Sequence, residues 1–176
     1  QKQVVMRPQQ LSLTAPDGRT LAGMASAQGD MDHFDTLVSE GHSPHQPDVF
    51  GETPLHLAAT YGHAFMVKEL IADFKVVVDA TNWEGWTPLG CAVANGHVEV
   101  AKLLVQQGAN YNHTCSPTGN SLLHLAGWYG AAESVDWLLK LGMVPEAVNV
   151  YGLRAFDMAP PGQARRLLHG RAYGQG

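Results

Sequence analysis

The sequence predicts an all-α solenoid, in which helix-turn-helix units stack in a row and are joined by β-hairpin-like loops. The first observation is an octet, Gly-x-Thr-Pro-Leu-His-Leu-Ala, that recurs along the chain. It is intact at 51–58, drifts at 85–92 and 119–126, and is faint at 18–25 and 152–159. The second is its period, because the leading glycines lie 33 or 34 residues apart. The third is an apolar segment with helical spacing that follows each octet. Self-similarity at such a period is the signature of a stack of short repeats.

The unit at 85–118 shows how each element is predicted. Thr87 is placed to cap a helix, and a proline follows it in the first turn, where a missing N–H costs nothing. Gly96 ends this short apolar helix, because glycine readily adopts the left-handed conformation that a helix end requires. A second helix opens at His97, has apolar residues at three-to-four spacing, and closes at Gly108.

The same pattern divides the chain. Residues 1–17 are expected to form an N-terminal extension or cap, and residues 18–176 the repeat domain. The expected units span about 18–50, 51–84, 85–118, 119–151 and 152–170. Phe74 stands where the other units have a glycine after the second helix. Prolines at 160 and 161 shorten the first helix of the last unit, whose second helix at 164–168 is weak.

These units resemble ankyrin repeats. The resemblance is carried by Thr-Pro-Leu-His-Leu-Ala, by Gly-His about ten residues after the threonine, and by Leu-Leu-x-x-Gly-Ala-x-x-Asn. It extends from Gly18 to about Leu168. It implies an elongated, slightly curved stack with no chemistry of its own, whose members bind other proteins along a concave face and a row of hairpin tips.

Composition narrows the classes of partner. A formal net charge of −5 provides no basic face for nucleic acid. No apolar run approaches the roughly 18–20 residues of a membrane span, so no direct membrane insertion is expected. The two cysteines are too few for a disulfide framework, which favours an intracellular location in the cytoplasm, the nucleus or both. We expect a protein or peptide partner and a monomer in isolation.

No enzyme, metal or cofactor is predicted. The sequence has no Gly-x-Ser-x-Gly elbow, no phosphate-binding glycine loop and no His-Glu-x-x-His. The resemblance assigns His56 and His124 a structural role, bonding backbone groups within and between repeats. His42 and His45 form a His-x-x-His pair, but a zinc ion needs three or four ligands, so this pair alone would not hold one.

The candidate binding residues are aromatic or acidic side chains near the hairpin tips and at the ends of the first helices, where the repeat register points them outward. Tryptophan and tyrosine bury large areas at low entropic cost and often anchor interfaces. The same rings could instead pack on adjacent hairpins. The predicted partner-binding residues are Phe50, Glu52, Tyr61, Trp83, Glu84, Trp86, Trp128, Tyr129 and Tyr151.

The sequence thus predicts a protein–protein interaction module that binds its partner through the concave face and hairpin tips, with Trp83, Trp86 and Trp128 as the main anchors. One alternative is a regulatory ankyrin segment of a larger enzyme or channel. Another is a methyl-lysine peptide reader, in which Glu84 and these tryptophans would cage a cation. Against that reading, Leu125 stands where such ankyrin domains have an aromatic residue.

Overall fold

The computed structural model describes residues 14–173, which form ten helices and one short pair of strands. The first helix of each successive pair is α1 (Leu21–Gln28), α3 (Pro54–Tyr61), α5 (Pro88–Ala94), α7 (Leu122–Trp128) or α9 (Ala155–Met158). The second is α2 (Met31–Ser39), α4 (Ala64–Ala72), α6 (Val98–Gln106), α8 (Ala132–Lys140) or α10 (Gln163–Tyr173).

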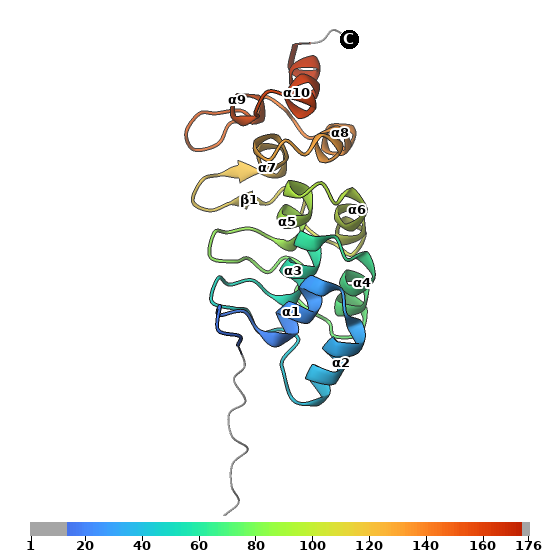
Figure 1. Cartoon of the computed structure of the whole chain (residues 1–176). Helices are drawn as coiled ribbons and strands as arrows, with labels where there is room; N and C mark the ends of the chain where they lie inside the picture. Colours follow the sequence, from blue (N-terminus) through green and yellow to red (C-terminus); the bar gives the residue numbers. More distant parts are fainter. Residues whose placement is uncertain (1–13, 174–176) are drawn as a thin grey trace, which may run out of the picture.

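The helix pairs stack one on the next, as predicted (Figure 1). Each first helix contacts the first helix of the following pair, and α4, α6, α8 and α10 make the corresponding contacts in the second column. The connecting hairpins project on the side of the first helices (Figure 1). Strands β1 (Thr114–Cys115) and β2 (Asn120–Ser121) form an antiparallel pair within one of these hairpins. The all-α stack with hairpin-like connections is therefore confirmed.

The helix ends follow the local signals in the sequence. The Thr53 side chain accepts from the backbone N–H of His56, and Pro54 occupies the first turn of α3. Thr87 caps α5 in the same way. Gly62 ends α3 in the left-handed conformation, with φ of 80°. Since these signals are local, the sequence predicts the start and end of each first helix closely.

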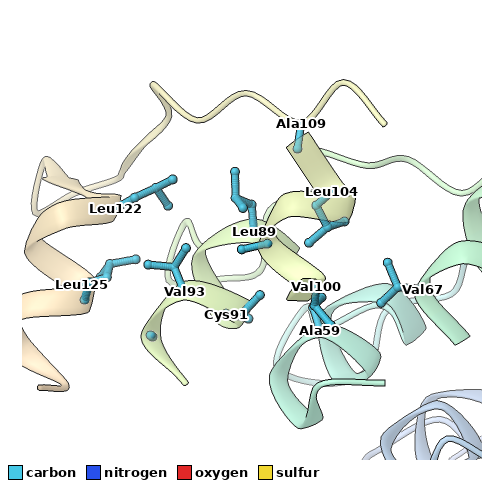
Figure 2. Packing of buried hydrophobic residues seen from close by; sticks show 14 of the residues in the cluster. Ala59, Val67, Leu89, Cys91, Val93, Val100, Leu104, Ala109, Leu122 and Leu125 are labelled. Atoms are coloured by element: carbon cyan, nitrogen blue, oxygen red, sulfur yellow. The ribbon is translucent and has the colours of Figure 1, made fainter. Parts of the chain in front are cut away.

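The core is one continuous apolar layer between successive helix pairs. Small residues such as Ala58 and Ala92 let neighbouring first helices approach, and both are fully buried. In Figure 2, Val93 of α5 and Leu125 of α7 turn toward one another across the boundary between two units. Because each pair buries its apolar face only against its neighbours, the stability of one unit depends on the next.

The structure explains the missing glycine at position 74. The Phe74 ring packs edge-on against the ring of Phe34, with centroids 5.2 Å apart. The left-handed turn that Gly108 makes in the next unit moves one residue onward, to Lys75, whose φ is 54°. The aromatic substitution therefore contributes to packing between the first two units.

The two ends of the stack differ in how they match the predictions. Thr14 and Thr20 form an antiparallel bridge, so a hairpin precedes α1, while the rest of the predicted extension, residues 1–13, lies outside the described residues. At the other end, α9 stops at Met158, before the two prolines. The predicted weak helix at 164–168 is too short, because α10 has 11 residues. No described helix is both long enough and apolar enough to cross a bilayer.

Candidate functional site

A groove of about 580 Å³ opens along the hairpin tips that precede α5, α7 and α9, and we refer to it as the tip groove. It brings together residues that are up to 75 positions apart, from Trp83 to Met158. Six of the nine predicted binding residues line it, and they share an aromatic ring or a carboxylate. These six are Trp83, Glu84, Trp86, Trp128, Tyr129 and Tyr151.

The hairpin tip that carries Trp83 to Trp86 is held by hydrogen bonds. The side-chain oxygen of Asn82 accepts from the backbone N–H of Glu84 at 3.1 Å and of Trp86 at 2.9 Å. Gly85 lies between them with φ of +77°, and a Cβ there would meet the carbonyl oxygen of Ser116 at 2.5 Å. Only glycine fits both the conformation and the close approach of the next hairpin.

Trp86 forms a fixed wall of the tip groove. Its ring is half-buried against the hydrophobic core and meets the Tyr129 ring edge-on, with centroids 5.7 Å apart and an angle of 88°. Its carbonyl oxygen accepts a hydrogen bond from His56 Nε2 at 3.0 Å. The expectation that the Trp86 side chain points away from the core is therefore wrong in part. The ring lines the groove, but one side of it packs against the edge of the core.

Trp83 combines the two roles that the sequence left open. Its indole Nε1 donates to the carbonyl oxygen of Val49 at 2.8 Å, and its backbone N–H donates to Phe50 at 3.1 Å. The ring thus packs on the preceding hairpin, over Gly51. It is nevertheless 72% exposed, so it retains a large area that a partner could cover.

Two further rings of the tip groove come from α7 and from the last hairpin tip. Trp128 ends α7 and is 57% exposed, while Tyr151 lies at the last hairpin tip and is 69% exposed. The backbone N–H of Tyr151 donates to the side chain of Asn149 at 3.0 Å, which holds this tip as Asn82 holds the earlier one. Large exposed rings on a fixed backbone are typical of binding surfaces.

The predicted residues Phe50 and Glu52 lie outside the tip groove, in a neighbouring hollow of about 320 Å³. We call it the Arg19 hollow, and Trp83 and Glu84 line both spaces. Arg19 Nη1 lies 3.4 Å from Glu52 Oε2, and its guanidinium carbon lies 5.8 Å from the centroid of the Phe50 ring. Burial raises the pKa of Glu52, and Arg19 partly opposes that shift.

These contacts change the expected role of two residues. Glu52 is one of the predicted partner-binding residues, yet the chain itself supplies a cation for its carboxylate. Tyr61, at the end of α3, is exposed but lines neither the tip groove nor the Arg19 hollow. The nine residues therefore do not form one continuous site.

Seven of the lining residues of the tip groove were not among the predicted set, and three of these seven are Leu125, Asn149 and Met158. Leu125 is 3% exposed. A signal for all three was present in the repeat register. Leu125 and Met158 each lie six residues after a leading glycine, and Asn149 lies three before one, as Asn82 does. The register therefore locates these positions in each unit, but it does not predict that they line a groove, because equivalents such as Leu57 and Cys91 are buried in the core.

The histidines of the repeat motif form hydrogen bonds to backbone carbonyl oxygens of neighbouring units. His124 Nε2 lies 2.9 Å from the carbonyl oxygen of Leu153, and His63 and His97 make equivalent bonds to the preceding unit. Burial lowers the pKa of both His56 and His124. Within residues 14–173, no cluster of three or more His, Cys, Asp or Glu side chains is arranged to hold a metal ion.

The sequence of this chain is similar to a known protein family and to several known proteins. A family model described as ankyrin repeats (3 copies) matches residues 22–115, more than half of the 176 residues. The chain is 40% identical over 76 residues to alpha-latrocrustotoxin-Lt1a of Latrodectus tredecimguttatus. It is 38% identical over 92 residues to SMC5-SMC6 complex localization factor protein 1 of Bos taurus. It is 39% identical over 77 residues to the probable 26S proteasome regulatory subunit p28 of Saccharomyces cerevisiae.

These matches cover 43%, 52% and 43% of this chain, respectively. They cover 5%, 9% and 34% of the three relatives. The matched segments therefore span about a third of one of these proteins and less than a tenth of each of the other two.

Proposed function

The chain belongs to the ankyrin repeat family, whose domains are generally protein-binding modules, and from this membership we propose that it binds a segment of a partner protein in the tip groove. The observation that carries the proposal is the gathering of six predicted residues, from three successive units, around one hollow. The mechanism is binding to a preformed surface and needs no chemical step.

The shape and composition of the tip groove support this function. Its volume of about 580 Å³ lies within the usual range for ligand sites, roughly 300–1,000 Å³. Trp86 is held by core packing and Trp83 by its hydrogen bond to Val49, so both rings are positioned before a partner arrives. Preorganised aromatic side chains lose little entropy on binding, which favours their use as anchors.

The relatives support a role within assemblies. Two of them are named as a localization factor for a complex and as a regulatory subunit. Because the match covers as little as 5% of one relative, a second candidate is a segment that regulates a larger protein, such as an enzyme or channel. In that case the tip groove would bind another part of the same polypeptide.

The proposed location is the cytoplasm or nucleus. Cys91 and Cys115 are both free thiols, buried in the structure. Free cysteines are typical of proteins that work in a reducing compartment. The proposal is checked by fractionating cells that express the tagged protein.

The decisive experiment captures the partner from a cell extract and then measures the affinity of its binding segment for purified variants. Trp83→Ala and Trp128→Ala should each weaken binding by about 2 kcal/mol or more, which is roughly 30-fold. Phe65→Ala is the matched control, because Phe65 is an exposed ring on α4 that does not line the tip groove. Trp86 is left unchanged, since its ring also packs against the core.

The double variant Trp83→Ala, Trp128→Ala separates the outcomes. A folded double variant with unchanged partner affinity would show that the tip groove is not the binding site. Tyr61→Ala then reports whether the interface instead lies along the ends of the first helices.

A further inference from the structure

The tip groove combines aromatic rings with a single charge. Five of its lining side chains are aromatic: Trp83, Trp86, Trp128, Tyr129 and Tyr151. Glu84 is the only charged residue among the described residues that line it. The face of an aromatic ring carries negative electrostatic potential and attracts a cation within about 6 Å. Rings and carboxylate therefore favour the same sign of charge in a guest.

The chain shows how such an environment is used one hollow away. In the Arg19 hollow, the guanidinium of Arg19 lies beside the Phe50 ring and forms an ion pair with Glu52. Glu84 and Trp83 line that hollow as well as the tip groove. In contrast to Glu52, Glu84 forms no ion pair with any cationic side chain within residues 14–173. Within the described residues, the tip groove thus also combines aromatic rings with a carboxylate, but no cationic side chain of the chain pairs with that carboxylate.

Other guests fit the tip groove less well. An anionic side chain would face Glu84 and the negative faces of the rings in a chain whose net charge is −5. A purely apolar side chain would cover Glu84 and remove water from its carboxylate without providing a partner, which is unfavourable. A cationic side chain with a long aliphatic stem avoids both problems. Its stem can pack on Leu125 and Met158, which line the groove.

We propose that the tip groove binds the alkylammonium side chain of a lysine in an extended partner segment, with the ammonium group between the tryptophan rings and the Glu84 carboxylate. This inference rests on the proposed function, because it names the side chain that the partner inserts. Unmodified and methylated lysine share this chemistry, and the experiment distinguishes them.

The four tryptophans of the chain allow a direct test by NMR. Trp83, Trp86 and Trp128 line the tip groove, whereas Trp137 is on α8, packs against the core and does not line it. Indole N–H signals of ¹⁵N-labelled protein are followed during titration with four nine-residue glycine–serine peptides. Their central residue is lysine, trimethyl-lysine, acetyl-lysine or norleucine. The two cationic peptides should shift the three groove signals and leave the Trp137 signal unchanged. The neutral peptides should bind at least about two- to fivefold more weakly than the cationic ones.

Glu84→Gln supplies the charge control. This variant keeps the shape of the side chain and should weaken binding of the cationic peptides by roughly two- to fivefold. Glu146→Gln, an exposed glutamate outside the tip groove, should leave their affinity unchanged. Tighter binding of trimethyl-lysine than of lysine assigns the guest as methylated lysine, and the reverse order assigns it as unmodified.

Two results would overturn the inference. Equal shifts with norleucine and lysine would show that the tip groove does not select for a cationic side chain, and the proposed function would still stand. Groove signals that stay unchanged with both cationic peptides at millimolar concentration would also refute the lysine assignment. The proposed function fails on a different measurement, an unchanged partner affinity in the Trp83→Ala, Trp128→Ala variant.

Discussion

His56 Nε2 donates a hydrogen bond of 3.0 Å to the carbonyl oxygen of Trp86, and this bond ties the first helix of one unit to the hairpin tip of the next. The other ring nitrogen, Nδ1, accepts from the backbone N–H of Thr53 at 3.2 Å. A neutral imidazole has one donor and one acceptor nitrogen, so these two partners assign the proton to Nε2. The histidine that helps to join two units therefore also positions a wall of the tip groove.

Acid should destabilise the fold through His56 and its counterpart His124. Burial lowers the pKa of each below its ordinary value of 6.5, so below that pH the unfolded chain binds more protons than the native one. The free energy of unfolding then decreases as the pH falls from about 7 through 6.5 toward the native pKa. Protonation would also turn Nδ1 of His56 into a donor facing the N–H of Thr53. Urea unfolding followed by circular dichroism at pH 7, 6 and 5 measures this decrease.

Substitution separates the histidine contribution from that of other titrating groups. His56→Gln and His124→Gln should each be less stable at pH 7, and each should lose less further stability between pH 7 and pH 5 than the wild type. If both variants keep the full wild-type pH dependence, neutral buried imidazoles are not its source.

Trp86 and Trp128 should respond differently to truncation, although both line the tip groove. Trp86→Ala removes a half-buried ring that packs against the core and Tyr129, and we expect a loss of about 2 kcal/mol in unfolding free energy. Trp128→Ala removes a ring that is mostly exposed and should change stability by no more than about 0.5 kcal/mol. Thermal and urea unfolding compare the two. Equal stability of both variants would contradict the assigned packing role of Trp86.

Gly127 should not tolerate a methyl group. It lies in α7, where a Cβ would meet the carbonyl oxygen of Ala155 at 2.8 Å and a methyl carbon of Leu168 at 3.3 Å. Gly127→Ala should therefore cost about 1–3 kcal/mol by pushing the last two units apart. Gly170→Ala is the matched control in α10, because among the described residues no heavy atom other than those of its chain neighbours and its own helix backbone lies within 4 Å of its Cβ position. That variant should gain up to about 1 kcal/mol from helix propensity. A Gly127→Ala protein as stable as the wild type would show that the two units can separate freely.

The two cysteines should resist alkylation in the native protein. Burial raises the pKa of Cys91 to about 12 and that of Cys115 to about 11. Because the thiolate is the reactive form, iodoacetamide at pH 8 should modify neither residue until urea unfolds the chain. Mass spectrometry of the protein with and without urea measures the labelling. Rapid native labelling of Cys115 would mean that the hairpin around it opens readily.

The residues that line the tip groove were predictable only in part from the repeat register. Trp83, Glu84, Trp128 and Tyr151 could be located because the register sets which side chains leave the core. The contact of Arg19 with Glu52 could not, because it joins the outer edges of two units and depends on how far apart their tips lie.

The residue pattern was sufficient to predict the all-α stack, the boundaries of the first helices and the structural histidines, because these follow from local caps, glycine turns and burial between nearest neighbours. Thr87, Gly96 and His97 carry such signals within 11 residues of one another. Packing between units decided what the pattern left open. As a result of this packing, Trp86 is half-buried and Arg19 forms an ion pair with Glu52. The same packing brings aromatic rings from successive units around the Glu84 carboxylate. Those outcomes depend on distances across units, which a one-dimensional repeat does not encode.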